Sequence, residues 1–190
     1  MRLFIGIELT PTVRASVASV SNRCRSLIDR AAPGAVLRWV DPDNLHITVW
    51  FLGEVDEERA AKLREVLLEP FRTAPFRVEL KGFGAFPPAG SPRVIWIGVK
   101  GHDAPVQVHQ ELAERLPSLG FEPERRAYSP HLTLARVREL RRADVAAVRS
   151  ILGRPVASVE RLEVPAITLF RSRLSPKGSQ YESLLRVPLR

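Results

Sequence analysis

Two histidine–threonine pairs are the residues of this sequence best suited to chemistry. His46 and Thr48 form one pair, and His131 and Thr133 form the other, each with a single residue between its members. Imidazole titrates near neutral pH, so one ring can accept a proton while a second, protonated ring donates one. A threonine hydroxyl can donate a hydrogen bond to an oxygen on which negative charge develops. Two copies of the pair therefore favour acid–base catalysis on a phosphate ester.

Each pair lies in a segment with the alternation of a β-strand. Residues 46–49 read HITV and residues 131–134 read HLTL. Successive side chains of a strand point to opposite faces, so histidine and threonine share one face and the aliphatic residues share the other. If helices bury the aliphatic faces, the His-x-Thr faces of two lobes line a groove. One such pair alone would favour an ordinary half-exposed histidine, whereas its duplication favours an active site.

The two pairs occupy the same place in a repeated order of elements. The chain opens with a strand at 2–9, a helix with Thr10 as N-cap and Pro11 at its first position, and a short strand at 36–40. The pattern predicts one α+β domain over residues 1–190, with two pseudo-symmetric lobes around a central active-site groove, each an antiparallel β-sheet with helices on its outer face. The first pass comprises a strand at 45–52, a helix at 56–71 and strands at 76–86 and 93–99; a helix at 104–116 leads to the second pass, with a strand at 128–137, a helix at 142–152 and strands at 156–170 and 180–189.

The composition restricts the class of protein. The 190 residues are 45% hydrophobic and 26% charged, which is typical of a globular chain. The one cysteine, Cys24, excludes an intramolecular disulfide and lies at a helical core position, so we expect a cytoplasmic protein. Two histidines without a third ligand argue against a metal site, so we expect no metal and no other cofactor. No apolar run reaches the roughly 18 residues of a membrane span, so we expect no membrane contact, and we expect a monomer.

The charge of the chain is unevenly distributed. There are 29 basic and 21 acidic residues, a net charge of +8, and arginine's planar guanidinium suits phosphate. Residues 1–95 hold 13 basic and 11 acidic residues, whereas residues 96–190 hold 16 and 10. An arginine bias also arises in GC-rich genomes, but uneven placement favours a polyanion. We therefore expect an RNA tail to lie over a C-terminal lobe, with Arg125, Arg126 and Lys177 contributing to its binding.

The motifs, taken in order, carry a family resemblance that covers essentially the whole chain. Paired H-x-T motifs in two β-lobes resemble the two-histidine (2H) phosphoesterase superfamily. Within it, the sequence is most similar to the bacterial and archaeal RNA 2′,3′-cyclic phosphodiesterases, also called 2′-5′ RNA ligases. The segments that carry the resemblance are RLFIGI at 2–7, NLHIT at 44–48 followed by FLG at 51–53, GAFP at 84–87, PRVIW at 92–96, PHLTLAR at 130–136 and GSQY at 178–181.

The resemblance implies metal-independent hydrolysis of a terminal 2′,3′-cyclic phosphate to a 2′-phosphate, with RNA or a cyclic nucleotide as substrate. One histidine activates water and the other protonates the departing 3′ oxygen. By analogy His131 is the base and His46 the acid, although the symmetry of the motifs leaves this assignment open. Thr48 and Thr133 would hold the phosphate. The same groups, run in reverse, would join RNA ends through a 2′-5′ bond.

The residue five positions after each histidine lines the site in this family. Here these residues are Phe51, which could stack on a base, and Arg136, which could bind phosphate with its guanidinium. An offset of five puts a residue on the opposite face of a regular strand, so both reach the groove only where the strand ends, twists or bulges. For Phe51 a core position is the stronger expectation. For Arg136 the lack of burial partners favours function.

Two other functions stay open at this point. A non-catalytic RNA- or nucleotide-binding module could use the same groove, although binding alone does not need two titratable rings. A 2′-5′ oligonucleotide phosphodiesterase would keep the chemistry and change the substrate. Tyr128 and the turn at 177–179 are candidate rim elements, whereas solvated positions are expected for His102 and His109.

Overall fold

The computed structural model describes residues 1–101, 103–123, 126–154, 159–175 and 178–190. Its strands form one antiparallel sheet. Neighbouring strands follow the order β7-β4-β5-β6-β3-β1-β8-β9, and β2 pairs with β6. The strands are β1 (Arg2–Glu8), β2 (Val36–Trp39), β3 (His46–Glu54), β4 (Phe76–Phe86), β5 (Val94–Lys100), β6 (His131–Glu139), β7 (Glu160–Val164), β8 (Ala166–Ser175) and β9 (Gly178–Pro188). The α-helices are α1 (Pro11–Ala31), α2 (Glu57–Leu68), α3 (Asp103–Arg115) and α4 (Val145–Leu152), and the short 3-10 helices are η1 (Pro42–Asn44), η2 (Leu116–Leu119) and η3 (Arg142–Asp144).

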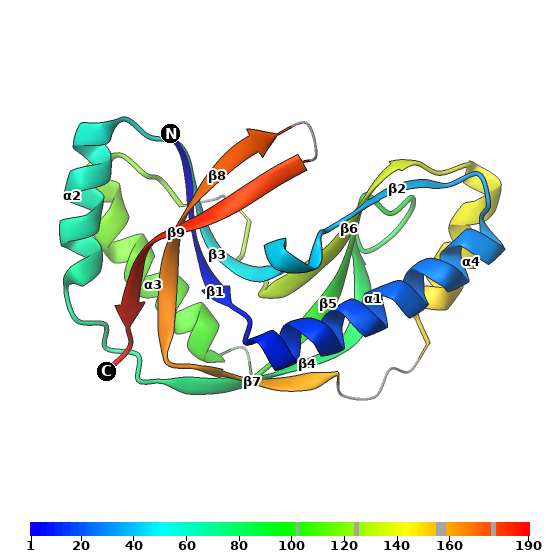
Figure 1. Ribbon diagram of the computed structural model, residues 1–190, viewed down its shortest axis with the longest axis horizontal. Helices are drawn as coiled ribbons and strands as arrows, with labels where there is room; N and C mark the ends of the chain where they lie inside the picture. Colours follow the sequence, from blue (N-terminus) through cyan, green and yellow to red (C-terminus); the bar gives the residue numbers. More distant parts are fainter. Residues whose placement is uncertain (102, 124–125, 155–158, 176–177) are drawn as a thin grey trace.

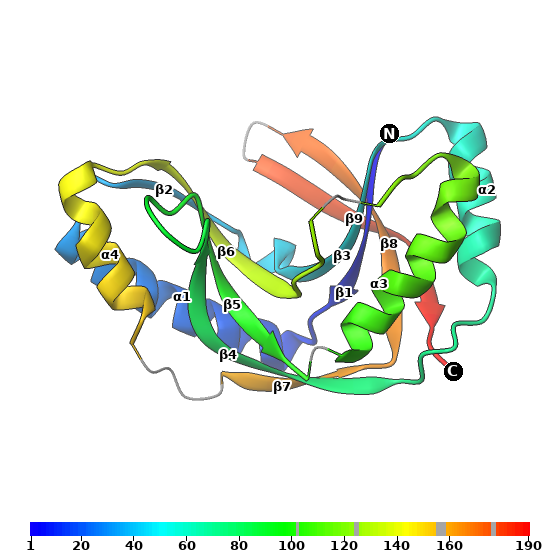
Figure 2. The same cartoon turned by 180° about the vertical axis from the view of Figure 1, so that it is seen from behind.

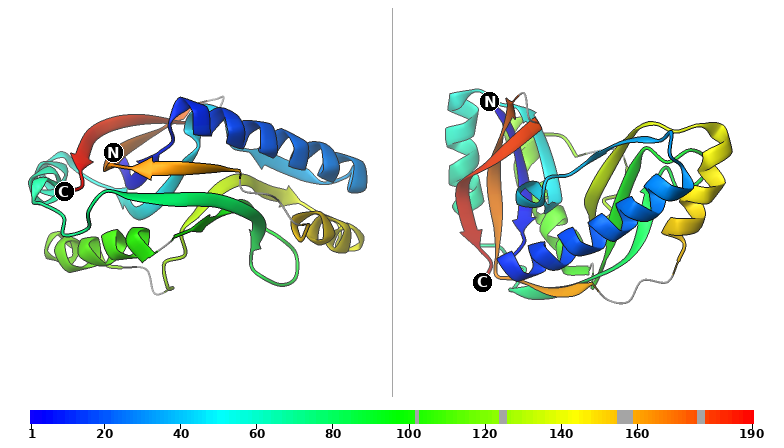
Figure 3. Two further views of the ribbon diagram at one scale, coloured as in Figure 1. Left: turned by 90° about the horizontal axis from the view of Figure 1, so that it is seen from below. Right: turned by 45° about the vertical axis from the view of Figure 1, so that its right-hand side comes forward.

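The sheet divides into two lobes where β3 meets β6. The register between these strands is a single residue pair, Ile47 opposite Leu132, and the strands on either side of it diverge (Figure 3). The first lobe holds His46 and consists of β3, β1, β8 and β9 with α2 and α3 (Figure 1). The second lobe holds His131 and consists of β6, β2, β5, β4 and β7 with α1 and α4 (Figure 2). The α+β fold with two antiparallel lobes is therefore confirmed.

The lobes are not the two halves of the sequence. Hairpin β4–β5 follows β3 in the chain, but β5 pairs with β6 of the second lobe. Hairpin β8–β9 follows β6 in the chain, but β8 pairs with β1 of the first lobe. Each lobe thus combines the His-x-Thr strand of one pass with the hairpin of the other. The expectation of a C-terminal lobe is wrong, because β8 and β9 belong to the lobe of His46.

One expected strand is two strands in different lobes. In place of a single strand at 156–170, whose first residues lie outside the described ranges, β7 ends at Val164 and β8 begins at Ala166. Pro165 separates them, and proline has no N–H to donate to a ladder. β7 pairs with β4 in the second lobe, whereas β8 pairs with β1 in the first. This proline therefore marks the point where the chain crosses between lobes.

Capping residues fix where two helices begin. The Thr10 hydroxyl accepts a hydrogen bond from the backbone N–H of Val13 at 3.3 Å, and Pro11 occupies the first position of α1. The Asp56 carboxylate accepts from the backbone N–H of Arg59 at 2.8 Å at the start of α2. Both helices therefore begin within one residue of the position that the sequence predicts.

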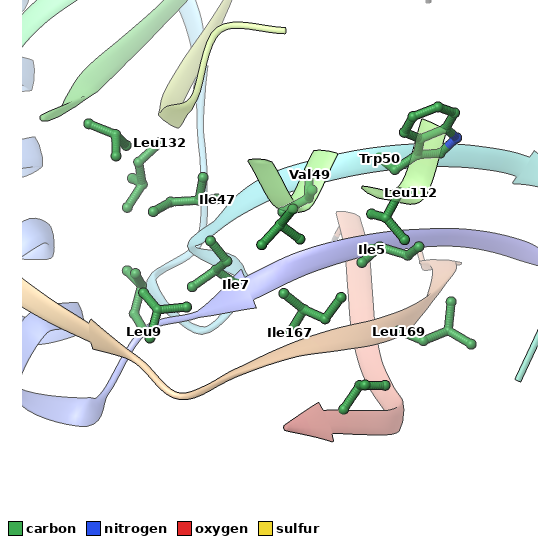
Figure 4. Close-up of a cluster of buried hydrophobic side chains, with 14 of the residues drawn as sticks. Ile5, Ile7, Leu9, Ile47, Val49, Trp50, Leu112, Leu132, Ile167 and Leu169 are labelled. Atoms are coloured by element: carbon green, nitrogen blue, oxygen red, sulfur yellow. The ribbon is translucent and has the colours of Figure 1, made fainter. Parts of the chain in front are cut away.

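Burial of aliphatic side chains decides which face of each motif strand carries the histidine. Ile47 and Val49 of β3 are buried in a core that includes Leu112 of α3 (Figure 4). Leu132 and Leu134 of β6 are buried in the same core. Each such side chain contributes about 1.5–3 kcal/mol when fully buried, so a slip of one residue in either strand is costly. The His-x-Thr side chains are consequently held on the inner face of each lobe.

Candidate active site

The same backbone device orients both histidines. Nδ1 of His46 lies 2.8 Å from the carbonyl oxygen of Asn44, and Nδ1 of His131 lies 2.7 Å from that of Ser129. A carbonyl oxygen only accepts hydrogen bonds, so Nδ1 carries a proton in both rings. Nε2 is left to accept a proton as neutral imidazole or to donate one as imidazolium. Each ring is thus set for proton transfer through Nε2 by the residue two positions before it.

The pairing of β3 with β6 brings the two motifs together. Ile47 lies directly opposite Leu132. In an antiparallel ladder the neighbours of such a pair lie opposite one another in turn, so this register sets the histidine of each motif toward the threonine of the other. In keeping with this placement, a positive charge on His131 lowers the pKa of His46 in addition to the larger effect of burial. The site therefore has a local twofold arrangement about the Ile47–Leu132 pair.

Burial lowers the pKa of both histidines below the ordinary value of 6.5. Loss of solvation of the imidazolium is the largest cause in each case. The hydrogen bond to the backbone carbonyl raises each pKa in part, while a neighbouring positive charge lowers it: His131 acts on His46, and the Arg136 guanidinium acts on His131. Both rings are therefore neutral at pH 7 in the free protein. An anion placed between them would favour protonation of one ring.

Aromatic side chains from three strands surround His46. The ring centroid of Phe4 lies 4.7 Å from that of His46, Tyr181 meets it edge-on at 5.0 Å, and Phe170 lies at 6.1 Å. Gly6 on β1 leaves the space that this packing needs. A Cβ atom there would lie 3.0 Å from a backbone carbonyl oxygen of β3 and 3.4 Å from Cδ2 of His46. A bare backbone at this position lets the imidazole lie directly over β1.

Two aromatic side chains of the β4–β5 hairpin pack against His131. Phe86 meets the imidazole edge-on with a centroid distance of 4.9 Å, and Trp96 lies at 6.2 Å. Trp96 stands opposite Gly84 in the register and lies across its backbone. A Cβ atom at Gly84 would come within 2.0 Å of the indole. Glycine is therefore required there for the indole to take its place beside the second histidine.

A β-bulge follows the threonine in each motif. The register of β3 with β1 passes over Val49, and the register of β6 with β5 passes over Leu134. One extra residue reverses the face of everything beyond it, so Phe51 and Arg136 return to the inner face of their strands. Phe51 is 54% exposed with its ring 6.4 Å from that of Phe4, and Arg136 is exposed. The core position expected for Phe51 is wrong, and the bulges are the physical reason.

The threonines lie on the same inner face as the histidines. The Thr48 hydroxyl is 2.9 Å from Nε2 of His46. It donates to the neutral ring and accepts from the protonated one. Thr133 is half-buried on β6, opposite Trp96 in the register with β5. The Thr48 hydroxyl therefore contacts a ring that would exchange protons, and Thr133 lies two positions from His131 on the same strand.

Asn44 supports the site, a role that the sequence alone did not indicate. Its backbone carbonyl holds His46, and its side-chain Nδ2 donates to the carbonyl oxygen of Ser179 at 2.7 Å. This bond ties the start of β9 to η1. The only signal for it in the sequence was its place in the NLHIT segment, because the turn at 177–179 is distant along the chain. Of that turn, Lys177 lies outside the described residues, as do His102 and Arg125.

Tyr128 supports the first motif through the backbone of β3. Its hydroxyl donates to the carbonyl oxygen of Thr48 at 2.8 Å, and burial raises its pKa well above the ordinary value. His109 stacks on the Tyr128 ring with a centroid distance of 4.4 Å, and Trp50 packs against His109 at 4.8 Å. The solvated position expected for His109 is therefore wrong. The stack fixes a backbone carbonyl next to the bulge of the first motif.

The chemistry available beside the two motifs is that of the imidazoles of His46 and His131, the hydroxyls of Thr48 and Thr133, the guanidinium of Arg136 and several aromatic rings. Within the described ranges, no group of three His, Cys, Asp or Glu side chains is arranged to hold a metal ion. No helix among the described residues is long and apolar enough to cross a membrane.

A bilobal antiparallel sheet with one His-x-Thr strand in each lobe defines a two-histidine phosphoesterase. The chain matches the 2′-5′ RNA ligase superfamily over residues 14–175, and it belongs to that family. It is 35% identical over 184 residues to the RNA 2′,3′-cyclic phosphodiesterase of Archaeoglobus fulgidus, covering 97% of this chain and 98% of the relative. The crystal structure of a Thermus thermophilus protein has a TM-score of 0.79 at 28% identity, covering 100% of this chain and 98% of that one. The structure of E. coli LigT complexed with 3′-AMP has a TM-score of 0.76 at 25% identity, covering 99% and 97%.

Proposed function

We propose that this protein hydrolyses terminal 2′,3′-cyclic phosphates of RNA to 2′-phosphates. The observation that carries the proposal is the pair of imidazoles whose Nδ1 atoms are both tied to backbone carbonyls, at 2.8 Å for His46 and 2.7 Å for His131. The relatives named RNA 2′,3′-cyclic phosphodiesterase support the substrate class. The 3′-AMP complex of E. coli LigT supports a nucleotide at the site.

The reaction needs one proton acceptor and one proton donor. A water oxygen attacks phosphorus while its proton passes to Nε2 of the neutral histidine. The bond from phosphorus to the 3′ oxygen breaks, and that oxygen takes a proton from Nε2 of the imidazolium, which leaves a 2′-phosphomonoester and a free 3′-hydroxyl. Each proton transfer contributes roughly 10²- to 10⁴-fold to the rate. The hydroxyls of Thr48 and Thr133 donate to the non-bridging oxygens, where negative charge builds up.

We assign His131 as the base and His46 as the acid. The guanidinium of Arg136 lowers the pKa of His131, which favours the neutral ring that a base requires. The same guanidinium can bind a non-bridging oxygen with its fork of N–H groups. Phe51, exposed on the inner face of the first lobe, offers a ring for a base to stack on. The two lobes would then hold the two ends of one terminal nucleotide.

The test is hydrolysis of 2′,3′-cyclic mononucleotides and of a short RNA with a 2′,3′-cyclic end, in the presence of EDTA. We expect turnover with a 2′-phosphate as the product, identified by chromatography against both phosphomonoester isomers. A 3′-phosphate product would contradict the bond-breaking step. Salt-sensitive RNA binding without turnover of any cyclic or 2′-5′-linked substrate would establish a binding module in place of an enzyme.

The superfamily name raises a second activity, the joining of RNA ends through a 2′-5′ bond. Microscopic reversibility allows it: a 5′-hydroxyl can take the place of water and attack phosphorus, the bond to the 3′ oxygen breaks, and the 2′ oxygen stays bonded. One ring takes the proton of the 5′-hydroxyl, and the other gives a proton to the 3′ oxygen. Turnover of a 2′-5′-linked dinucleotide, measured with the same protein, would reveal it.

We also propose that the protein acts as a monomer, because both histidines come from one chain. We propose a cytoplasmic location, where Cys24, buried and with its pKa raised to about 11, remains a thiol.

A further inference from the structure

Two pairs of strand arginines differ in whether a carboxylate lies against them. On the first lobe, Arg171 and Arg173 of β8 both pair with Glu182 of β9, with N–O distances of 2.6 and 3.2 Å. On the second lobe, Arg38 and Arg136 are exposed, and neither forms an ion pair with any residue that the structure describes. Arg38 and Arg136 therefore carry positive charge that no described carboxylate pairs with.

Arg38 and Arg136 lie side by side on the inner face. Arg38 of β2 stands directly opposite Arg136 of β6 in the antiparallel register. Residues directly opposite one another share a face, with Cα atoms about 4.5–5.5 Å apart. The bulge at Leu134 puts Arg136 on the inner face, so Arg38 is there too. Leu37, the neighbour of Arg38, packs against the core on the other face, which agrees with this placement.

Two like charges directly opposite one another on adjacent strands destabilise a sheet. Within the described ranges no carboxylate offsets this pair. A ligand with closely spaced negative charges would relieve the repulsion, and guanidinium groups bind phosphate oxygens with two parallel N–H groups. The pair therefore fits a polyanion with more than one phosphate.

The two arginines lie at different distances from the histidines. Arg136 is close enough to His131 for its charge to act on that ring, whereas Arg38 lies one strand further away. We propose, on the basis of the function proposed above, that Arg38 binds the phosphodiester immediately 5′ of the terminal cyclic phosphate. The RNA chain then leaves the two histidines across β6 and β2 of the second lobe. Arg38 is thus a residue that distinguishes oligonucleotides from mononucleotides.

The experiment compares Arg38→Gln with the wild-type protein on two substrates, a 2′,3′-cyclic mononucleotide and a trinucleotide with a 2′,3′-cyclic end. The measured quantity is the ratio of kcat/KM on the trinucleotide to kcat/KM on the mononucleotide. We expect this ratio to fall about tenfold, as for loss of one hydrogen-bonded charge. The dependence of log(kcat/KM) for the trinucleotide on log[salt] should become shallower by about 0.7. Arg38→Lys keeps the charge and should keep the wild-type salt dependence.

Arg173→Gln is the matched control, because it removes an exposed strand arginine that already pairs with a carboxylate, that of Glu182. Its ratio should equal that of the wild type. An unchanged ratio for Arg38→Gln, or an equal fall for Arg173→Gln, would overturn the inference while leaving the hydrolysis intact. Wild-type protein that cleaves neither substrate would instead overturn the proposed function. Thermal unfolding checks folding, and relief of the arginine pair predicts that Arg38→Gln unfolds no lower than wild type.

Discussion

The two lobes hold their histidines in the same way but surround them with different side chains. In both, a backbone carbonyl fixes Nδ1, and a bulge after the threonine returns the fifth residue to the inner face. In the first lobe that fifth residue is Phe51, and His46 lies among aromatic rings. In the second lobe it is Arg136, and His131 lies beside a guanidinium.

This difference separates what the lobes share from what each one recognises. The features common to both lobes place two Nε2 atoms for proton transfer. The reaction needs both, because one proton leaves the attacking water and another is given to the departing oxygen. The fifth position is where the lobes diverge: an aromatic face suits a base, and a guanidinium suits phosphate. The duplicated His-x-Thr motif thus explains the acid–base chemistry. The difference at the fifth position explains how a nucleotide would be oriented, with its base toward the first lobe and its phosphate toward the second.

Removal of either ring tests the part that the lobes share. We expect His46→Ala and His131→Ala each to lower kcat by about 10³-fold, because each removes one proton transfer. The double variant should be about as slow as either single variant, since both rings act in one step. Kinetics are measured beside thermal unfolding, which should stay cooperative. Near-normal activity in either single variant would rule out the paired mechanism.

A substrate with sulfur in place of the 3′ oxygen of the cyclic phosphate distinguishes the acid from the base. A thiol has a pKa of about 8.5, so the sulfur leaves as a thiolate without a proton from the protein. We expect this substrate to restore much of the activity of His46→Ala and little of that of His131→Ala. The reverse pattern would exchange the acid and base assignments.

Arg136→Gln tests the charge of the second lobe. We expect kcat/KM to fall about 100-fold, which is typical for loss of one donor to a developing negative charge. The pKa of His131 should rise when the guanidinium is removed, so the acid limb of the pH profile should move to higher pH. A fall in kcat/KM without movement of that limb would show that Arg136 does not act on the base.

Phe51→Ala tests the aromatic character of the first lobe. Loss of one stacked base predicts an increase in KM of about tenfold, whereas Phe51→Tyr should stay near wild type. Because Phe51 is 54% exposed, the melting temperature should change little. An equal loss of activity and stability would indicate a packing role in place of stacking.

The faces of the two motifs could be predicted from the sequence because they depend on local alternation. Ile47 and Leu132 alternate with His46 and His131. Burial of the aliphatic residues therefore puts both histidines on the opposite face of their strands. The bulges at Val49 and Leu134 could not be predicted, because an extra residue is defined only against the partner strand. Their effect reverses the expectation drawn from strand parity.

The distribution of charge could not be predicted for a related reason. In the count by sequence halves, Arg171 and Arg173 belong to the more basic half, which also holds His131. The exchange of hairpins puts them in the lobe of His46, where Glu182 pairs with both. Arg38, from the less basic half, lies opposite Arg136 instead. Long-range pairing, which a single sequence does not display, decides which charges face the substrate.

The smallest expected effect is the contribution of the two rings to stability as a function of pH. Both pKa values lie below 6.5 in the folded protein, so the unfolded chain binds more protons at acid pH. The stability that the neutral rings provide is therefore complete above pH 6.5 and decreases as the pH falls below it. The melting temperature of wild type relative to the His46→Gln/His131→Gln double variant should be constant from about pH 7 to 8 and decrease toward about pH 5. The single variants should not add up to the double variant, because the charge on His131 acts on His46. A relative melting temperature that stays flat or rises toward acid pH would contradict the lowered pKa values and, with them, the neutral pair of rings in the free protein.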